Sequence, residues 1–120
     1  MTLVFYQKEG KRFKYAYSFK LNEKASQIVF DKLKRHFKLP KIKLQYDNRV
    51  KEGQFCEDDW VITIKKKSNM GVIIHEVAHA LQQKNESMTK HDKQMMETIH
   101  YIYKYVKLKN FWKTELHRRI

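Results

Sequence analysis

The chain has 120 residues and a formal net charge of +13, from 26 Lys and Arg against 13 Asp and Glu. This length suits one domain rather than two, so we expect residues 1–120 to form a single domain around one modest hydrophobic core. A single cysteine excludes an intrachain disulfide, and no segment is long and apolar enough for a signal-peptide core or a membrane span, so we expect a cytoplasmic protein that does not enter a membrane.

The basic charge is strongest in the first half of the chain. Residues 1–50 hold 13 basic and 4 acidic side chains, whereas residues 51–120 hold 13 and 9. An excess of positive charge attracts polyanions such as nucleic acid through long-range steering and counterion release. A Lys-rich surface that is simply solvated would have the same composition, so both interpretations stay open.

The N-terminal forty residues predict a β-hairpin followed by a helix. We expect a strand over residues 2–8 and a turn at residues 9–10. Aromatic side chains then alternate with Arg, Lys, Ala and Ser over residues 13–19, which predicts a second strand, although this segment could instead lead directly into the helix. Asn22 is a favourable N-cap for that helix, and Pro40 ends it.

The middle of the chain predicts three short strands. Apolar and polar residues alternate over residues 41–46, and a second short strand is expected over residues 53–56 after a turn. Residues 60–64 predict a strand most strongly, because they are continuous and rich in β-branched side chains.

The last third predicts two helices. The first is capped by Ser68 or Asn69 and buries an apolar face between Val72 and Leu81, and the second opens with a capping box over residues 89–92. The apolar side of the second helix is formed by Met95, Met96, Ile99, Ile102, Tyr103 and Val106. The chain is therefore predicted to be an α+β domain, with a small antiparallel sheet, one helix before the sheet and two helices after it.

A His-Glu-x-x-His pattern lies on the first of these two helices, at His75, Glu76 and His79. Residues four apart on a helix share a face, so both imidazoles can reach one zinc ion at about 2.0–2.1 Å. Glu76 projects one helical step away, where it can act as general base on the attacking water. With six His and eight Glu in the chain, random order gives about 0.02 such matches, so histidines that only face solvent or cap a neighbour are the weaker interpretation.

A zinc peptidase site usually has a third protein ligand and one position left for water. Gln82 and Asn85 stand where a metzincin has Gly and His, which excludes that class. We favour His91, at the predicted start of the final helix, as the third ligand. Glu97, inside that helix, is the first alternative, and His100, one turn further along, is the second.

These motifs resemble the SprT-like, or Spartan-type, zinc metallopeptidases in their order along the chain: a helix, strands ending at residues 60–64, His75-Glu76-x-x-His79, and His91 opening a helix. The chain also resembles small phage and actinobacterial proteins that are regarded as metallohydrolases and have the same layout. The resemblance covers roughly residues 22–110. It implies a minimal zincin-like domain and, from the phage relatives, a phage or viral gene.

The resemblance also makes two statements about the site. It implies that the third ligand belongs to a His-Gly-Pro-x-Phe-like segment, of which this chain keeps His91 and, loosely, Met95. It further implies that the strand near residues 60–64 lines the substrate cleft, where an extended peptide would pair with it.

These observations predict a zinc-dependent metallopeptidase that acts on a protein or peptide substrate, with Zn²⁺ as cofactor and nucleic acid as an additional partner of the basic surface. One alternative is a basic nucleic-acid-binding module in which zinc is structural or absent. Another is a zinc hydrolase of a non-peptide bond. The sequence does not predict the oligomeric state.

Overall fold

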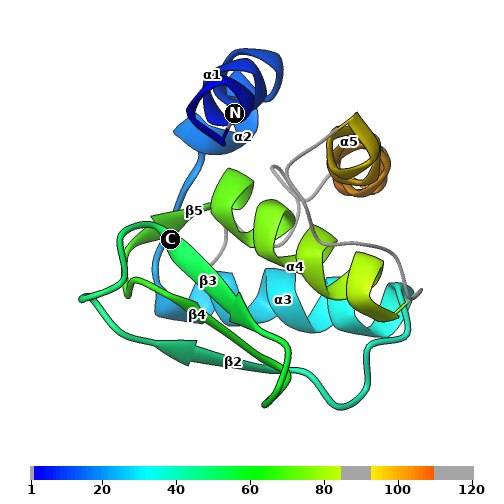
Figure 1. Cartoon of the computed structure of the whole chain (residues 1–120). Helices are drawn as coiled ribbons and strands as arrows, with labels where there is room; N and C mark the ends of the chain where they lie inside the picture. The colour runs from blue at the N-terminus through cyan, green and yellow to red at the C-terminus, as the bar shows by residue number, and fades with distance from the viewer. Residues whose placement is uncertain (1, 85–92, 110–120) are drawn as a thin grey trace.

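The computed structural model describes residues 2–84 and 93–109, with side chains from residue 7 onward. It confirms the α+β class (Figure 1). The elements follow one another as α1 (Thr2–Arg12), α2 (Lys14–Ser18), β1 (Lys20–Leu21), α3 (Glu23–His36), β2 (Lys43–Tyr46), β3 (Gly53–Cys56), β4 (Val61–Ile64), β5 (Ser68–Asn69), α4 (Met70–Lys84) and α5 (Lys93–Leu108).

The N-terminal segment is helical, so the predicted β-hairpin is wrong. Residues 2–8 belong to α1, the expected turn at residues 9–10 lies inside the same helix, and residues 14–18 form α2. Burial follows a helical spacing, because Phe13 and Ala16 are buried whereas Tyr15 is exposed. Packing of this face against the rest of the molecule, including a ring contact between Phe13 and Tyr103, outweighs the strand preference of the alternating aromatic residues.

The strands form two small sheets. In the three-stranded sheet the order is β2-β4-β3, with β2 parallel and β3 antiparallel to β4. The sheet is therefore mixed, whereas the sequence predicted an antiparallel one. The second sheet pairs β1 with β5 in antiparallel register and was not predicted. It ties the start of α3 to the start of α4.

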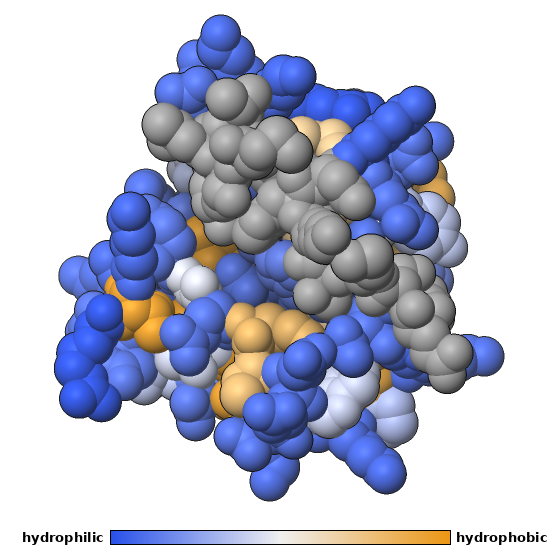
Figure 2. Space-filling model, in the orientation of Figure 1, coloured by the Kyte–Doolittle hydropathy of each residue, from blue (hydrophilic) through white to orange (hydrophobic). Residues whose placement is uncertain are grey.

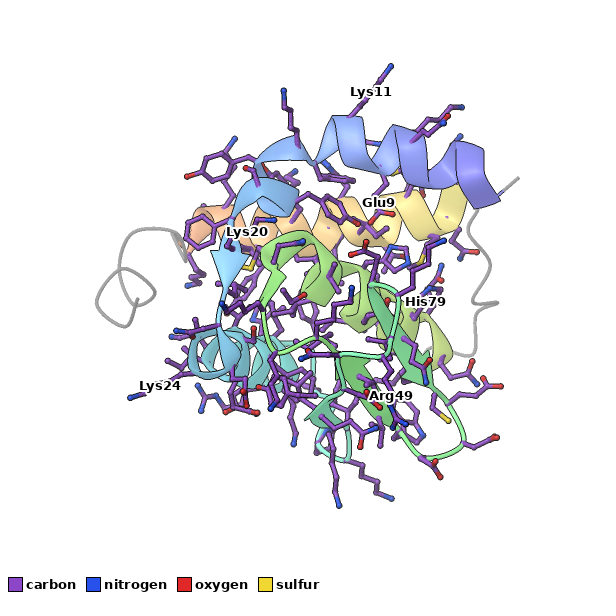
Figure 3. The ribbon with its side chains drawn as sticks, turned by 90° about the vertical axis from the view of Figure 1, so that its left-hand side faces the viewer. Glu9, Lys11, Lys20, Lys24, Arg49 and His79 are labelled. Carbon is purple, nitrogen blue, oxygen red and sulfur yellow. The ribbon has the colours of Figure 1, made fainter. Side chains whose placement is uncertain are left out.

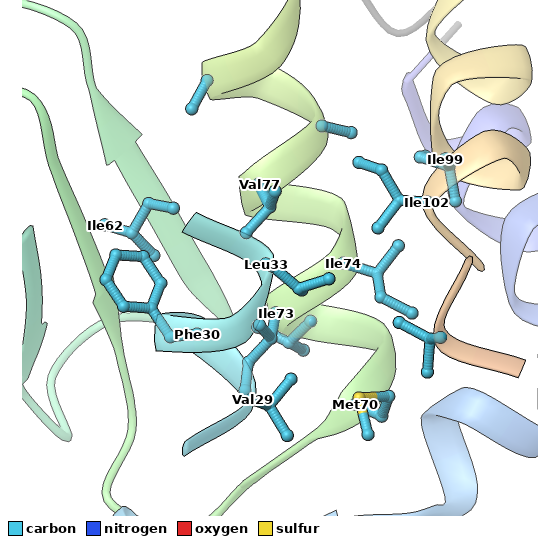
Figure 4. Close-up of a cluster of buried hydrophobic side chains, with 14 of the residues drawn as sticks. Val29, Phe30, Leu33, Ile62, Met70, Ile73, Ile74, Val77, Ile99 and Ile102 are labelled. Atoms are coloured by element: carbon cyan, nitrogen blue, oxygen red, sulfur yellow. The ribbon is translucent and has the colours of Figure 1, made fainter. Parts of the chain in front are cut away.

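Helix α4 occupies the centre of the fold. It packs against α3, α5 and the three-stranded sheet, and twelve of its fifteen residues are buried. The side chains around it form one core (Figure 4). The labelled members are Val29, Phe30, Leu33, Ile62, Met70, Ile73, Ile74, Val77, Ile99 and Ile102.

The predicted caps of α3 and α4 are confirmed. The side-chain oxygen of Asn22 accepts a hydrogen bond of 2.8 Å from the backbone N–H of Ala25. Asn69 accepts one of 2.9 Å from the N–H of Val72 in the same way. Each bond satisfies an N–H group that has no partner inside the helix, and thereby fixes where the helix begins.

The visible surface is mostly hydrophilic, with small separate groups of apolar side chains (Figure 2). Among the described helices, none combines the length and the apolar character needed to cross a membrane.

Candidate metal centre

Helix α4 brings the three residues of the His-Glu-x-x-His pattern to one pocket. The rings of His75 and His79 lie 4.9 Å apart between centroids, as expected for residues one helical turn apart. The pocket has a volume of about 370 Å³. It is lined by Gly53, Gln54, Phe55, Glu57, His75, Glu76 and His79. Its walls are therefore α4 and the segment that contains β3.

A carboxylate from α1 holds His75. The two carboxylate oxygens of Glu9 lie 2.9 and 2.8 Å from His75 Nδ1, and the side chains of both residues are at most 5% exposed. The hydroxyl of Tyr17, in α2, donates to the same carboxylate. Figure 3 shows Glu9 on the side of α1 that faces the other helices, and His79 on α4.

The sequence alone does not point to Glu9, because residues 9–10 are predicted to form a turn between two strands. Its partner His75 lies 66 positions further along the chain, so no local pattern connects the two residues. One signal was present: Glu9 is the single acidic residue among the first 22.

Glu76 is buried beside the two histidines, with 6% of its surface exposed. Burial raises the pKa of its carboxyl to about 7; the charge of His75 opposes this shift, and that of Glu9 adds to it. A carboxyl with a pKa near neutrality can accept and release a proton under ordinary conditions. This property suits the general-base role predicted for Glu76.

Gly53 gives Glu76 its space. A Cβ atom at this position would lie 2.9 Å from Val72 Cγ1 and 3.3 Å from Glu76 Oε2. Any larger residue would push against the carboxylate, so β3 can pass close to α4 because residue 53 is glycine. The sequence predicts this residue only as the start of a strand.

The strand beside the pocket is β3, which corrects the expectation for residues 60–64. That segment contains β4, the central strand, whose two edges are occupied by β2 and β3. A central strand has no free edge for a peptide. Among the strands of the described residues, β3 pairs with β4 alone, and Gly53, Gln54 and Phe55 from this strand line the pocket.

The three candidates for the third zinc ligand are His91, Glu97 and His100, and the structure describes the last two. His91 lies outside the described residues. Glu97 is exposed on α5, and His100 lies on the same helix with its ring centroid 6.1 Å from that of Phe13. Within residues 2–84 and 93–109, no group of three or more His, Cys, Asp or Glu is arranged to hold a metal ion. The structure thus does not bring Glu97 or His100 together with His75 and His79.

The side chains that line the pocket fit two of the protein ligands of a zinc site. His75 contacts Glu9 through Nδ1, so Nε2 is the nitrogen that would serve as its metal ligand, and His79 is one turn away. Imidazole nitrogens are common zinc ligands, and a histidine that binds a metal usually donates its other N–H to a carboxylate or a carbonyl. The Glu9–His75 pair has this arrangement.

Comparison with known proteins identifies no relative: no protein-family model, curated protein or solved structure matches the chain.

Proposed function

We propose that this chain is a zinc-dependent metallopeptidase in which His75 and His79 bind the ion and Glu76 moves the protons. The observation that carries the proposal is the geometry of one pocket, which is lined by two histidines one helical turn apart and by a buried carboxyl. Glu9 contacts Nδ1 of one of these histidines, His75. A zinc ion held there would polarise the scissile carbonyl and acidify a water molecule. His91, which the sequence favours, is proposed as the third ligand.

Glu76 is the proton carrier in this proposal. Its carboxylate accepts a proton from the attacking water and later delivers it to the amine that leaves. The raised pKa, about 7 in the metal-free site, matches a group that must both take and give a proton. The carboxyl lies close to Gly53, where an added Cβ atom would be 3.3 Å from Glu76 Oε2.

The shape of the pocket favours an extended peptide as substrate. β3 lines the pocket, and within the part of the chain that the structure describes its one strand partner is β4. A peptide backbone can add to such an edge through main-chain hydrogen bonds, which places a peptide bond beside the histidines. This argument favours a peptide over a small ester or amide. A zinc hydrolase of a non-peptide bond is the outcome to accept if esters are cleaved and peptides are not.

Hydrolysis of unstructured peptides tests the proposed activity. We expect the zinc-supplemented protein to cleave a library of fluorogenic peptides, and the Glu76→Gln variant to bind zinc while losing at least about 100-fold in rate. His91→Ala should lose the metal, whereas Glu97→Ala and His100→Ala should keep it. Full activity in metal-loaded Glu76→Gln would contradict the role of this residue.

The net charge supports a second candidate, a nucleic-acid-binding module. The formal charge of +13 would attract a polyanion. In that case oligonucleotide binding would depend steeply on salt and would be unchanged in Glu76→Gln. For both candidate functions we place the protein in the cytoplasm. A basic surface that contacts nucleic acid fits the peptidase as well as the binding module.

A further inference from the structure

One buried carboxylate, that of Glu9 in α1, connects the N-terminal helices to the proposed metal centre. Glu9 is 1% exposed and touches His75 Nδ1 with both oxygens. A buried carboxylate without partners would be strongly destabilising, so its contacts must compensate for lost hydration. His75 and Tyr17 both contact it. Glu9 is therefore placed to act on a histidine that the function requires.

Tyr17 is positioned by close packing against the first turn of α4. A Cβ atom built at Gly71 would lie 2.6 Å from atoms of the Tyr17 ring. Only glycine at this position lets the ring lie against the helix backbone, and the ring then carries its hydroxyl to Glu9. Three segments, α1, α2 and the start of α4, thus cooperate to hold one carboxylate.

The contact with Glu9 decides which nitrogen of His75 can bind a metal. A carboxylate accepts a hydrogen bond from Nδ1–H, so the neutral ring keeps its proton on Nδ1 and has its lone pair on Nε2. The same contact fixes the rotation of the ring. A ligand held in one tautomer and one orientation binds a metal ion more tightly than one that must be ordered on binding.

We propose that Glu9, itself held by Tyr17, is a positioning residue that fixes His75 as the Nδ1–H tautomer and raises the affinity of the site for zinc. The N-terminal helices are then a part of the metal centre, although they supply no ligand to it. The effect on zinc affinity rests on the proposed function; the effect on the tautomer does not.

Nitrogen-15 NMR of the metal-free protein tests the tautomer directly. In the wild type we expect His75 to carry its proton on Nδ1, and in Glu9→Ala we expect a mixture or the Nε2–H form. A role in packing alone would not move this signal in a protein that stays folded. Glu9→Gln serves as the second variant, because it keeps the size of the side chain if the alanine variant does not fold.

Competition with a chromogenic chelator measures the second effect, on zinc. We expect Glu9→Gln to bind zinc about 10–100-fold more weakly than the wild type, and Tyr17→Phe to be weakened by less. Phe13→Leu is the matched control, because it trims a buried side chain between α1 and α2. The backbone N–H of Phe13 donates to the carbonyl oxygen of Glu9 at 2.9 Å, a bond that the substitution keeps, so zinc affinity should stay within about twofold.

The two readouts separate the possible failures. An Nε2–H tautomer in the wild type, or unchanged zinc affinity in folded Glu9 variants, would overturn the positioning role. If the wild type bound no zinc while Glu9 still set the tautomer, the positioning role would stand and the proposed peptidase function would be wrong.

Discussion

At the scale of single residues, the site combines groups that are costly to bury. The carboxyls of Glu9 and Glu76 both lie at or near full burial beside His75. Glu9 is compensated by hydrogen bonds, and the pKa of Glu76 is raised instead, mainly by burial. A buried carboxyl with a raised pKa in a pocket, such as Glu76, is typical of functional sites, since a fold selected only for stability has little reason to keep it.

The raised pKa of Glu76 predicts how pH changes the stability of the metal-free protein. The carboxyl has a pKa of 4.5 when unperturbed and about 7 in the fold. Below pH 4.5 it is protonated in both states and costs nothing. As the pH rises from 4.5 to 7, the unfolded chain releases this proton more readily than the folded one, so the fold loses stability, and the loss is complete above pH 7.

Glu76→Gln should remove that loss. We expect the variant to be more stable than the wild type by about 1–3 kcal/mol at pH 8, with the difference vanishing near pH 4.5. Urea unfolding with a chelator present, at a series of pH values, measures both. Stability curves that run parallel from pH 4.5 to pH 8 would contradict the raised pKa of Glu76.

Gly53→Ala should harm the site more than it harms the fold. The added methyl group would press on Val72 and on the Glu76 carboxyl, so we expect a loss of about 1–3 kcal/mol in stability and a larger fractional loss of peptide hydrolysis. The matched control is Gln54→Ala in the same strand, whose side chain is exposed and which should have a small effect on stability. Equal behaviour of the two variants would contradict the close packing of β3 on α4.

At the scale of elements, the sequence predicted what has a local cause. The caps at Asn22 and Asn69 and the apolar periodicity placed α3 and α4 correctly, and the β-branched run placed β4. The first two helices could not be predicted, because their aromatic alternation resembles a strand and their helical burial depends on packing against distant segments.

The residues of the site also separate into those with a local sequence signal and those without one. His75, Glu76 and His79 could be predicted, because helical spacing alone places them together. Glu9 could not, because its contact joins segments 66 residues apart. The choice of β3 as the strand beside the pocket depends on the strand order, which the sequence does not encode in any short pattern.

Two glycines test the helical N-terminus and its docking. Gly10 lies inside α1, where an added Cβ meets nothing within 4 Å, so Gly10→Ala should stabilise the protein by about 0.5–1 kcal/mol. If residues 9–10 formed a turn with positive φ, the same change would destabilise it. Thermal unfolding distinguishes these outcomes.

Gly71→Ala is the contrasting change. A methyl group there would displace the Tyr17 ring, so we expect a loss of about 1–3 kcal/mol together with weaker zinc binding. Stability measured by urea unfolding of the metal-free protein, and affinity measured by chelator competition, report the two effects separately. A stable Gly71→Ala protein with unchanged zinc affinity would contradict the docking of α2 on α4.

At the scale of the whole molecule, the net charge of the chain differs in sign from the charged residues that line the pocket. The chain carries a formal charge of +13, yet the pocket lining contains no Lys or Arg among the described residues and includes Glu57 and Glu76. A polyanion would therefore be attracted to the molecule but not into the pocket. Nucleic acid is expected to act as a partner bound elsewhere on the surface rather than as the substrate.

Salt dependence tests this separation. We expect oligonucleotide affinity, followed by fluorescence anisotropy, to fall by at least about tenfold between roughly 50 and 200 mM salt. Hydrolysis of a short uncharged peptide should change little over the same range and should not be inhibited by the oligonucleotide. Competitive inhibition would place the polyanion in the pocket and contradict the separation.

The most direct test of the central claim is the zinc content of the purified, zinc-supplemented protein, measured by elemental analysis beside three variants. We predict about one zinc per chain in the wild type and in Glu76→Gln, and little in His75→Ala or His79→Ala. A wild type without zinc, or one whose zinc survives the loss of either histidine, would contradict the assignment of this pocket as a metal centre.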